Sequence, residues 1–452
     1  MCERETLEKK VYLLGIGMGG HKMMTEEVKE RLRFADCIIG ASRMVESALA
    51  AIKEMKKSDT QETPYSSGLH ENTESLGLET YCEYRAPEIA GFIREHTSCK
   101  RFAVVFSGDT GFYSGAKKLA EALGEYTEGT EYTVEMFPGV SSVSYLASRL
   151  NVSWEDAKIV CLHGQTSNYI QSIAYHEKVF LLLGRKGQEE EICEKLNWYG
   201  LGETEVAVGK NLSYPEEEIF IKKASELKPK DVEGLAAAMV FHPHPLKKTC
   251  AHVPDSAFIR AEAGKKTVPM TKEEIRAAVI AKLGLERDSV LWDVGAGTGS
   301  VSIEAALLSE DIRVYAVEKN AEAIALLREN KRKFKTDWVE IVEGTAPDAL
   351  KNLEAPTHVF IGGSSGNVKD ILRTVLKMNS RARVVLTAIS LETVKEAMEA
   401  MQEGLLPNAE VTQIFVAKSR ELGTFHMMMG QNPVYIISAG EKERDTARKE
   451  TI

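Results

Sequence analysis

The chain has 452 residues, enough for two or three domains, and a hydrophobic content of 43% that allows each of them a sizeable core. It is acidic, with a net charge of −10 from 57 Lys and Arg against 67 Asp and Glu. An acidic chain without a long run of basic residues disfavours duplex nucleic acid as its main partner.

The N-terminus and the cysteines indicate the compartment. Residues 1–10 are charged and lack the apolar core of a signal peptide, and no apolar run reaches the length of a membrane span. The seven cysteines are odd in number and form no C-x-x-C pair, which is typical of reduced thiols. We therefore expect a cytoplasmic protein with no membrane partner.

The first half alternates short apolar strands with loops that contain glycine. A strand at 11–14 runs into Gly15-Ile16-Gly17-Met18-Gly19-Gly20, and Thr25 can cap the helix that follows. Further strands are expected at 35–40, 102–106, 132–137, 159–162, 179–183, 206–209, 219–220 and 239–241. The polar stretch from about 56 to 87 is expected to contain a long loop or an insertion. Open α/β sheets bind ligands at the carboxyl ends of their strands, so these loops are candidate sites. Taken alone, the first glycine turn is equally well explained as an ordinary connection between a strand and a helix.

The two halves are joined by a linker, expected at 242–256. X-Pro steps after His242 and His244 favour extended backbone there. These two histidines, Cys250 and His252 invite comparison with metal ligands, but their spacing fits none of the usual zinc patterns. We therefore predict no metal site.

The second half begins with an amphipathic helix that runs to about Leu283. Thr271 is a candidate N-cap for it, and Glu274, three residues on, would complete a capping box. Strands at 291–294, 313–317, 339–342, 358–361, 383–388, 411–416 and 434–437 follow, with helices between the first five. This alternation predicts an α/β fold.

A glycine turn after the first of these strands is the most informative stretch. The strand and the turn together read Leu291-Trp292-Asp293-Val294-Gly295-Ala296-Gly297-Thr298-Gly299-Ser300, and a helix is expected from about Ser300. Glycine permits positive φ and leaves room for a ligand, and the first turn of the helix offers free N–H groups. The dinucleotide fingerprint differs, because its last glycine comes one position later.

Two acids accompany this turn. Asp293 precedes it, and Glu318 ends the next strand, where its carboxylate can accept hydrogen bonds from the ribose hydroxyls of an adenosyl ligand. A glycine triplet alone is weak evidence, but a strand, the triplet, a helix, a strand and then an acid form a specific combination. The tighter glycine spacing and the second acid favour S-adenosylmethionine over NAD.

The first half resembles the tetrapyrrole (corrin/porphyrin) methylase family. The resemblance rests on three segments, Gly15-Ile16-Gly17-Met18-Gly19, Ser107-Gly108-Asp109-Thr110-Gly111-Phe112-Tyr113 and Pro138-Gly139-Val140-Ser141-Ser142. The family usually has proline where Met18 and Thr110 stand, while the glycines and Asp109 are in place. The resemblance implies a fold of two α/β subdomains that bind S-adenosylmethionine between them.

The second half resembles the class I methyltransferases that decarboxylate precorrin-6B, which have a Rossmann-like fold. The shared segments are residues 270–276 and 291–300, Val317-Glu318-Lys319-Asn320 and Phe360-Ile361-Gly362-Gly363. In this order, the two modules resemble the family of bifunctional precorrin-6Y C5,15-methyltransferases (decarboxylating) of cobalamin biosynthesis. The resemblance implies a methylase module at 9–241, a class I module at 257–440 and a charged tail at 441–452.

The resemblance also implies two sites for S-adenosylmethionine. In the second half, the implied cofactor-binding residues are Thr271, Asp293, Gly295, Ala296, Gly297, Thr298, Gly299, Glu318, Gly344, Thr345 and Ala346. In the first half, they are Gly15, Gly17, Gly19, Gly108, Asp109, Gly111, Phe112, Tyr113, Ser141 and Ser142. The two serines are equally well placed to cap a helix. We expect no Ser/His/Asp triad, because the sulfonium donor is already activated and the protein mainly supplies orientation and a dry cavity.

The implied substrate is a precorrin or cobalt-precorrin macrocycle. The first half would methylate C5, and the second half would methylate C15 and remove the C12 acetate carboxyl as CO2. An acidic protein needs local cations to bind such a polycarboxylate. Candidates near strand ends are Arg43, Arg149, Arg185 and Lys186, with solvated surface charge as the alternative for each. Gly362 and Gly363 would face the macrocycle, and the relatives imply a homo-oligomer.

A competing hypothesis is an RNA methyltransferase carried by the second half, with the first half as a non-catalytic scaffold. The acidic balance and the lack of a basic stripe count against it.

Overall fold

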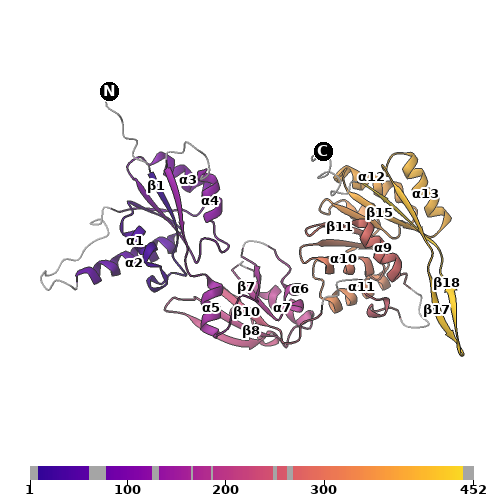
Figure 1. The fold of residues 1–452 in the computed structure, drawn as a ribbon, viewed down its shortest axis with the longest axis horizontal. Coiled ribbons are helices and arrows are strands. Elements are labelled where there is room, and N and C mark those ends of the chain that lie inside the picture. The colour runs from indigo at the N-terminus through magenta and orange to yellow at the C-terminus, as the bar shows by residue number, and fades with distance from the viewer. Residues whose placement is uncertain are drawn as a thin grey trace, which may run out of the picture. The chain divides into compact units, whose positions relative to one another are not determined.

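The computed structural model describes residues 9–60, 78–124, 132–163, 166–184, 187–247, 252–261 and 268–440. The chain divides into two compact units. Unit 1 is formed by the residues up to Thr166 together with Lys178–Cys193 and Glu203–Phe241, and unit 2 by Ser167–Glu177, Glu194–Gly202 and the residues from His242 onward. Figure 1 shows unit 1 largely in indigo and magenta and most of unit 2 in orange and yellow.

Unit 1 contains a five-stranded parallel sheet. Its strand order is β3 (Glu79–Cys82), β2 (Cys37–Gly40), β4 (Arg101–Phe106), β1 (Lys9–Gly15) and β5 (Tyr132–Phe137). Val11 and Leu13 of β1 pack with α3 (Ala86–Glu95) and α4 (Ala116–Leu123). Tyr12 and Leu14 face the other side, with α1 (Glu26–Arg33) and α2 (Ser42–Thr60). Helices thus cover both faces, which is why these strands are almost continuously apolar.

A second, mixed sheet completes unit 1. Its order is β6 (Lys158–Cys161), β7 (Lys178–Leu182), β10 (Ala236–Phe241), β8 (Glu205–Lys210) and β9 (Glu218–Lys223), with β10 antiparallel to both of its neighbours. Helix α5 (Ser142–Leu150) packs against it through Val143, Leu146 and Ala147. The shorter elements are η1 (His21–Met23), η3 (Ala224–Glu226) and α8 (Pro229–Val232).

Unit 2 is built on a seven-stranded sheet. Its order is β13 (Val339–Glu343), β12 (Arg313–Glu318), β11 (Val290–Val294), β14 (His358–Ile361), β15 (Arg383–Ala388), β19 (Val434–Ala439) and β16 (Glu410–Ile414). The first five strands are parallel, and β19 is antiparallel to both of its neighbours. Trp292 and Leu291 of β11 point to opposite faces, into two separate clusters of the core.

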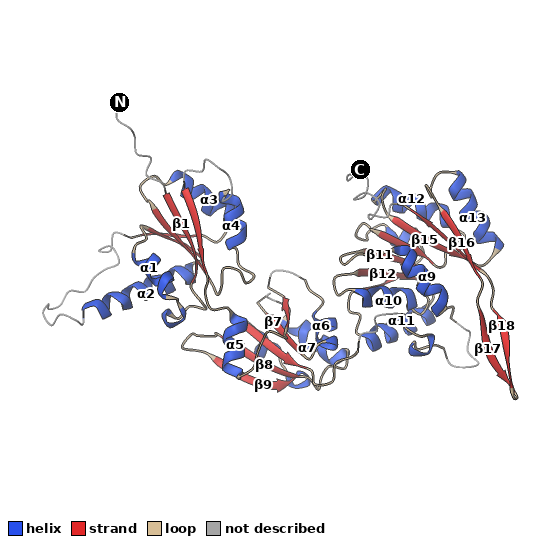
Figure 2. Cartoon of the chain, in the orientation of Figure 1, coloured by secondary structure: helices blue, strands red, loops and turns tan. Residues whose placement is uncertain are grey.

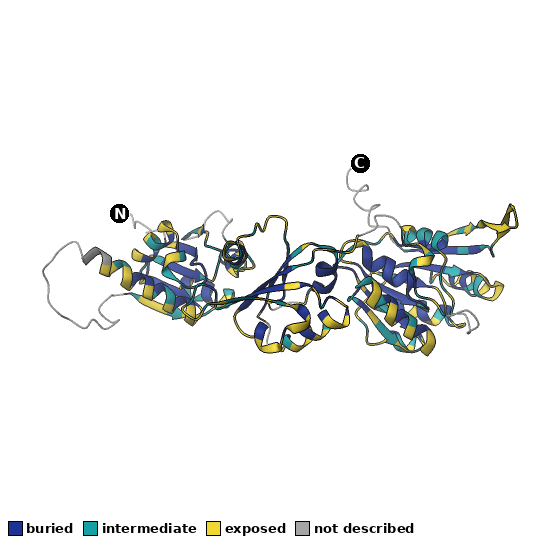
Figure 3. Cartoon of the chain, turned by 90° about the horizontal axis from the view of Figure 1, so that it is seen from below, coloured by how far each residue is buried: buried dark blue, intermediate teal, exposed yellow. Residues whose placement is uncertain are grey.

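Helices cover both faces of this sheet as well (Figure 2). One face carries α9 (Glu273–Leu283), α10 (Ser300–Leu308) and α11 (Ala321–Phe334), and the other carries α12 (Val368–Met378) and α13 (Leu391–Gln402). Unit 2 also holds η4 (Asp255–Ala257), η5 (Asp348–Leu350) and α6 (Tyr169–Tyr175), while α7 (Glu189–Trp198) is divided between the units. The buried residues concentrate in the strands and on the sides of the helices that face them (Figure 3).

A two-stranded hairpin extends from the sheet of unit 2 (Figure 2). It consists of β17 (Ala417–Leu422) and β18 (Phe425–Gly430), in which almost every residue is exposed. The sequence analysis does not predict it, because a hairpin that is exposed on both faces has no alternation of buried and exposed positions.

The expected strands are largely confirmed, and so is the cap of α1, where Thr25 Oγ1 accepts a hydrogen bond from the Val28 N–H at 3.3 Å. The stretch between about 56 and 87, expected to contain a long loop or an insertion, has regular structure at both of its ends. Helix α2 continues to Thr60, and β3 forms the edge of the first sheet; residues 61–77 lie outside the described residues. Strand β3 is partly exposed, so it lacks the apolar run that marks the inner strands.

Three further findings concern the expected linker, the C-terminal tail and membrane spans. Val253 and Phe258, at the end of the expected linker, are buried in a cluster with Ile303 and Leu307 of α10. The expected tail at 441–452 and Cys250 lie outside the described residues. Within the part of the chain that the structure describes, no helix is long and apolar enough to cross a membrane.

Candidate functional site

The main cavity of unit 2 lies where its parallel strands end. It has a volume of about 530 Å³ and is lined by residues that directly follow five strands, from β11 to β15. They are Gly295, Ala296 and Gly297 after β11, Lys319 and Asn320 after β12, Gly344, Thr345 and Ala346 after β13, Gly362 to Ser365 after β14, and Ile389 after β15. The carboxyl edge of an open α/β sheet is the usual place for a ligand site.

The glycine turn requires glycine for two reasons. Gly295, Gly297 and Gly299 have φ values of 76°, 58° and 79°, in the left-handed region that favours glycine. A Cβ on Gly295 would lie 2.7 Å from the Gly363 carbonyl oxygen, and a Cβ on Gly297 would lie 2.6 Å from the Pro269 carbonyl oxygen. The turn is therefore closely packed between two other segments that line the cavity.

Glu318 connects the ends of two neighbouring strands. Its Oε2 accepts a hydrogen bond from the Gly297 N–H at 2.9 Å, and its Oε1 accepts from the N–H groups of Lys319 and Asn320 at 2.8 and 2.9 Å. Since a carboxylate offers about four acceptor positions, these bonds fix its orientation and leave about one position for a ligand hydroxyl.

Asp293, Thr298 and Gly299 do not line this cavity. Asp293 is 1% exposed, and the Ser302 hydroxyl of α10 donates to its Oδ2 at 2.5 Å. Burial raises the pKa of Asp293 to about 7. The hydrogen bonds from Ser302 oppose this rise, and the negative charge of Glu318 adds to it. Thr298 is buried at 1% exposure, and Gly299 caps α10 with its α-carbon facing Leu327. Asp293 is thus buried before the turn, while Thr298 and Gly299 connect the turn to α10 without lining the cavity.

Thr271 lines the cavity, but its predicted role as a helix cap is wrong. The N-cap of α9 is Lys272, and no side chain caps it. The expected partner, Glu274, is bound instead to Lys418 at 2.6 Å. The predicted capping box therefore does not form, because Glu274 pairs with a lysine of β17 that is distant in the sequence.

Unit 1 has a smaller cavity of about 200 Å³. Of the predicted residues, Arg43, Gly108, Phe112, Tyr113 and Ser142 line it. The Arg43 guanidinium lies over the Tyr214 ring, 5.6 Å from its centre. Tyr113 has a φ of 48°, an uncommon backbone conformation for a bulky residue.

The other predicted residues of unit 1 hold its loops together. Asp109 accepts hydrogen bonds from Gly111 N–H at 2.8 Å and from Gly139 N–H at 3.0 Å, which joins two of the three predicted segments. Gly15 and Gly17 contact the same loops: a Cβ on Gly15 would lie 2.7 Å from the Gly139 nitrogen, and Gly17 pairs with Gly108.

Gly19 and Ser141 do not line the cavity either. Gly19 is packed against Tyr214, whose hydroxyl oxygen would be 2.3 Å from an added Cβ. Ser141 is the N-cap of α5 and accepts a hydrogen bond from Ser144 N–H at 3.3 Å, so the helix-cap alternative holds for it.

The cations predicted to bind the substrate, other than Arg43, are not found on the cavity wall within the described residues. Arg185 and Lys186 lie outside the described residues. Arg149 forms an ion pair with Glu217 at 3.0 Å and is not among the residues of the cavity wall, which disfavours it as a substrate contact. Within the described residues, no group of three His, Cys, Asp or Glu side chains could hold a metal ion.

Sequence reasoning missed several residues that line the cavities. In unit 1 they include His163, which follows β6, and its position after an expected strand was the available signal. In unit 2 they include Pro269, Thr387, Gln431 and Asn432. Gln431 and Asn432 precede β19, an antiparallel strand, so the rule that places ligands after parallel strands does not find them.

The geometry of unit 2 defines a class. A glycine turn at the start of a helix, an acid at the end of the next strand and a cavity across five parallel strand ends characterise the Rossmann-like class I methyltransferases, whose methyl donor is S-adenosylmethionine. More particularly, the chain belongs to the precorrin methyltransferase family. Residues 263–440 match the model of the precorrin methyltransferase domain, and residues 10–228 match that of the tetrapyrrole (corrin/porphyrin) methylases.

Individual relatives align with the second half. The probable cobalt-precorrin-6B C(15)-methyltransferase (decarboxylating) of Pyrobaculum calidifontis is 44% identical over 190 residues, 41% of this chain and 94% of that protein. The cobalt-precorrin-6B C(15)-methyltransferase (decarboxylating) of Salmonella typhimurium is 36% identical over 190 residues, 42% of this chain and 96% of that protein. A solved structure, precorrin-6Y C5,15-methyltransferase from Geobacter metallireducens, is 38% identical, covers 42% of this chain and 98% of its own, and has a TM-score of 0.39.

Proposed function

We propose that this chain methylates a precorrin-6-type macrocycle at two carbons during cobalamin biosynthesis. Unit 2 methylates C15 and removes the C12 acetate carboxyl as CO2, and unit 1 methylates C5. The proposal for unit 2 draws on relatives that are named for C15 methylation with decarboxylation. The observation that carries it is the Glu318 carboxylate, bound to the glycine turn and lining a cavity of about 530 Å³.

The residues of the unit 2 cavity fit S-adenosylmethionine, which supplies a methyl group already activated by its sulfonium. Glu318 keeps about one acceptor position for a ribose hydroxyl. The glycine turn presents only small residues to the methionine end, because Gly295 and Gly297 have no side chain and Ala296 has only a methyl group. The backbone at Gly344 to Ala346 would flank the adenine.

The rim of the same cavity suits a large macrocycle with carboxylates. Met270, Ile389 and Val434 provide apolar surface, and Lys319 provides a cation. The Lys319 ammonium donates to the Ser365 hydroxyl at 2.8 Å, so it stands beside the loop that begins with Gly362 and Gly363. In such a cavity, the chain's contribution is to orient the ring carbon and to exclude water.

We propose a second donor site in unit 1. Its smaller cavity joins Gly108, Tyr113 and Ser142 from the predicted segments, with Arg43 available for a substrate carboxylate. Titration of the chain with S-adenosylhomocysteine should give two binding events. A single event that is lost when Glu318 is replaced would instead make unit 1 a non-catalytic scaffold.

The decisive experiment is mass spectrometry of a precorrin-6-type substrate after incubation with the chain and S-adenosylmethionine. The expected product has gained two methyl groups and lost one CO2. A product that retains the carboxyl would refute the decarboxylation, and an unchanged macrocycle would refute the function. The comparisons give no support to the RNA methyltransferase hypothesis.

We further propose that the enzyme works in the cytoplasm as a homo-oligomer without a nucleic-acid partner. The net charge of −10 supports the last point, because an excess of carboxylates disfavours binding to a phosphate backbone. Light scattering coupled to gel filtration tests the oligomer, and a mass equal to one chain would refute it.

A further inference from the structure

One wall of the unit 2 cavity belongs to no helix or strand. It is the segment Val268, Pro269, Met270, Thr271 and Lys272, directly before α9, and all five residues line the cavity. The Pro269 carbonyl oxygen lies so close to the glycine turn that a Cβ on Gly297 would be 2.6 Å away. The position of this wall segment therefore determines how much room the cavity has beside the glycine turn.

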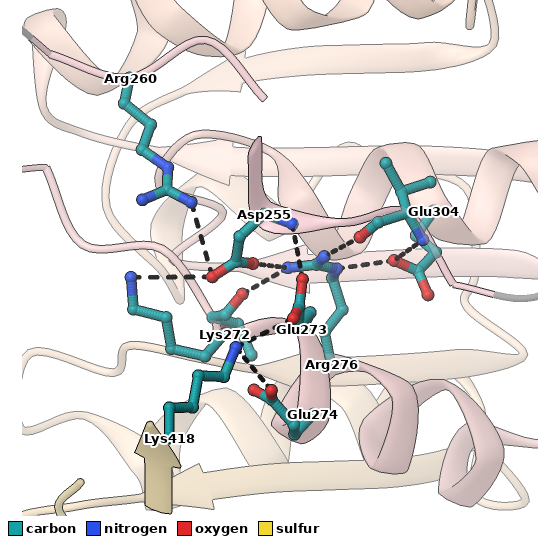
Figure 4. A network of polar contacts seen from close by, with 10 residues as sticks. Asp255, Arg260, Lys272, Glu273, Glu274, Arg276, Glu304 and Lys418 are labelled. Carbon is teal, nitrogen blue, oxygen red and sulfur yellow. Dashed lines mark hydrogen bonds and ion pairs between the residues drawn. The ribbon is translucent and has the colours of Figure 1, made fainter. Parts of the chain in front are cut away.

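The wall segment is held from behind by Arg276. This residue lies in the first turns of α9, is fully buried and does not line the cavity. Its Nη1 donates a hydrogen bond to the Thr271 carbonyl oxygen at 2.5 Å. Figure 4 shows the guanidinium at the centre of a network of polar contacts.

The other contacts of the guanidinium fix it to the body of unit 2. Its Nε donates to Glu304 of α10 at 2.6 Å, its Nη1 also reaches Asp255 at 3.1 Å, and its Nη2 donates to the Val253 carbonyl oxygen. Its carbon centre lies 4.9 Å from the centre of the Phe258 ring. A fully buried charge is tolerated only when it is paired and hydrogen-bonded. Here these bonds also fix the orientation of the guanidinium.

A second set of contacts fixes the start of α9 (Figure 4). Glu273 accepts a hydrogen bond from the Asp255 N–H at 2.8 Å, and Lys418 pairs with Glu273 at 2.9 Å and with Glu274 at 2.6 Å. The Asp255 N–H and Lys418 lower the pKa of Glu273 to about 2, so this carboxylate is charged at neutral pH. The helix that carries Arg276 is thus anchored independently of the cavity.

We propose that Arg276 is a positioning residue of the methyl-donor site in unit 2. It acts through the Thr271 carbonyl to hold the wall segment against the glycine turn before the donor binds, so that binding does not have to order it. The inference rests on the proposed function of unit 2.

The test replaces Arg276 with lysine, which keeps the charge but cannot reach Thr271, Glu304 and Val253 at once. In calorimetry with S-adenosylhomocysteine, we expect one of the two sites to weaken about tenfold and the other to stay unchanged. The KM for S-adenosylmethionine, followed by CO2 release, should rise by a similar factor, with kcat within about twofold of the parent.

The matched control is Arg383→Lys. Arg383 is also buried, at 6% exposure, and it donates to the carbonyl oxygens of Lys282 and Gly440 at 3.1 and 3.0 Å, away from the cavity. We expect this control to lower the melting temperature but to leave the affinity for S-adenosylhomocysteine unchanged. Equal loss of affinity in both variants would show that Arg276 acts only through stability and would overturn the proposal.

A second variant, Phe258→Leu, tests the same proposal if Arg276→Lys does not fold. It removes the ring behind the guanidinium but no hydrogen bond, and a smaller, selective weakening of the same site is expected. Affinity equal to that of the parent in every folded variant at Arg276 or Phe258 would overturn the proposal. If the parent chain itself does not bind S-adenosylhomocysteine, the proposed function fails instead.

Discussion

The Glu318 carboxylate accepts a hydrogen bond from the Gly297 amide at 2.9 Å, which ties the end of one strand to the glycine turn after its neighbour. Both residues line the cavity of unit 2. The bond aligns the turn and the acid before a ligand arrives, so a change at either residue should affect donor binding more than folding.

Glu318→Gln tests this arrangement directly. The amide can no longer accept hydrogen bonds at both ends, and we expect the affinity of the unit 2 site for S-adenosylhomocysteine to fall about tenfold by calorimetry. The matched control is Glu343→Gln. Glu343 ends the adjacent strand β13 in register with Glu318 and does not line the cavity, so its replacement should leave the affinity unchanged. Equal losses would contradict the assigned role of Glu318.

Gly295→Ala separates backbone strain from steric conflict. At Gly404, with a φ of 75° and no atom within 4 Å of an added Cβ, alanine should cost only the backbone strain of roughly 1–2 kcal/mol. Gly295 has nearly the same φ, 76°, but the added Cβ would lie within 2.8 Å of the Gly363 backbone. We therefore expect Gly295→Ala to be clearly less stable than Gly404→Ala in urea unfolding and to lose donor binding at unit 2. Equal stability of the two variants would show that the turn can move away from Gly363.

Asp293→Asn should change how stability depends on pH. Because burial raises the pKa of Asp293 to about 7 in the folded state, the unfolded chain releases this proton first as the pH rises. Below about pH 4 both states are protonated, and from there to about pH 7 the ionisation destabilises the fold progressively, by up to about 4 kcal/mol. The asparagine variant lacks this loss, so its stability relative to the parent should increase over that interval.

Urea unfolding at several pH values measures the effect of Asp293. The exposed Asp288, just before β11, offers the control Asp288→Asn, which should follow the parent profile. A constant difference between Asp293→Asn and the parent across this pH range would contradict the raised pKa.

Arg43→Gln tests the substrate contact in unit 1. Removal of this cation from the cavity wall should raise the KM for the macrocycle in C5 methylation severalfold and leave C15 methylation unchanged. The control is Arg85→Gln, since Arg85 is paired with Glu83 at 2.6 Å and does not line the cavity. Product masses at limiting macrocycle distinguish the outcomes, and loss of both methylations would indicate a general defect.

Much of the fold could be predicted because the inner strands are apolar runs buried on both faces. Val11 to Leu14 and Leu291 to Val294 show this pattern, and so does the glycine turn that follows the second of them. The exposed hairpin β17–β18 and the edge strand β3 could not be found in this way, because exposed positions are not constrained to be apolar.

The sequence by itself determined the two α/β modules, the glycine turn and the acid that follows the neighbouring strand, because each depends on local backbone geometry or on burial of a short run. Only the tertiary structure decided which of the marked residues reach a cavity: Asp293 lies under the turn, Asp109 joins two loops, and the wall before α9 is held by Arg276. Those roles depend on contacts between residues far apart in the chain, and a hydrogen bond from Arg276 to residue 253 or 304 leaves no periodic trace in the sequence.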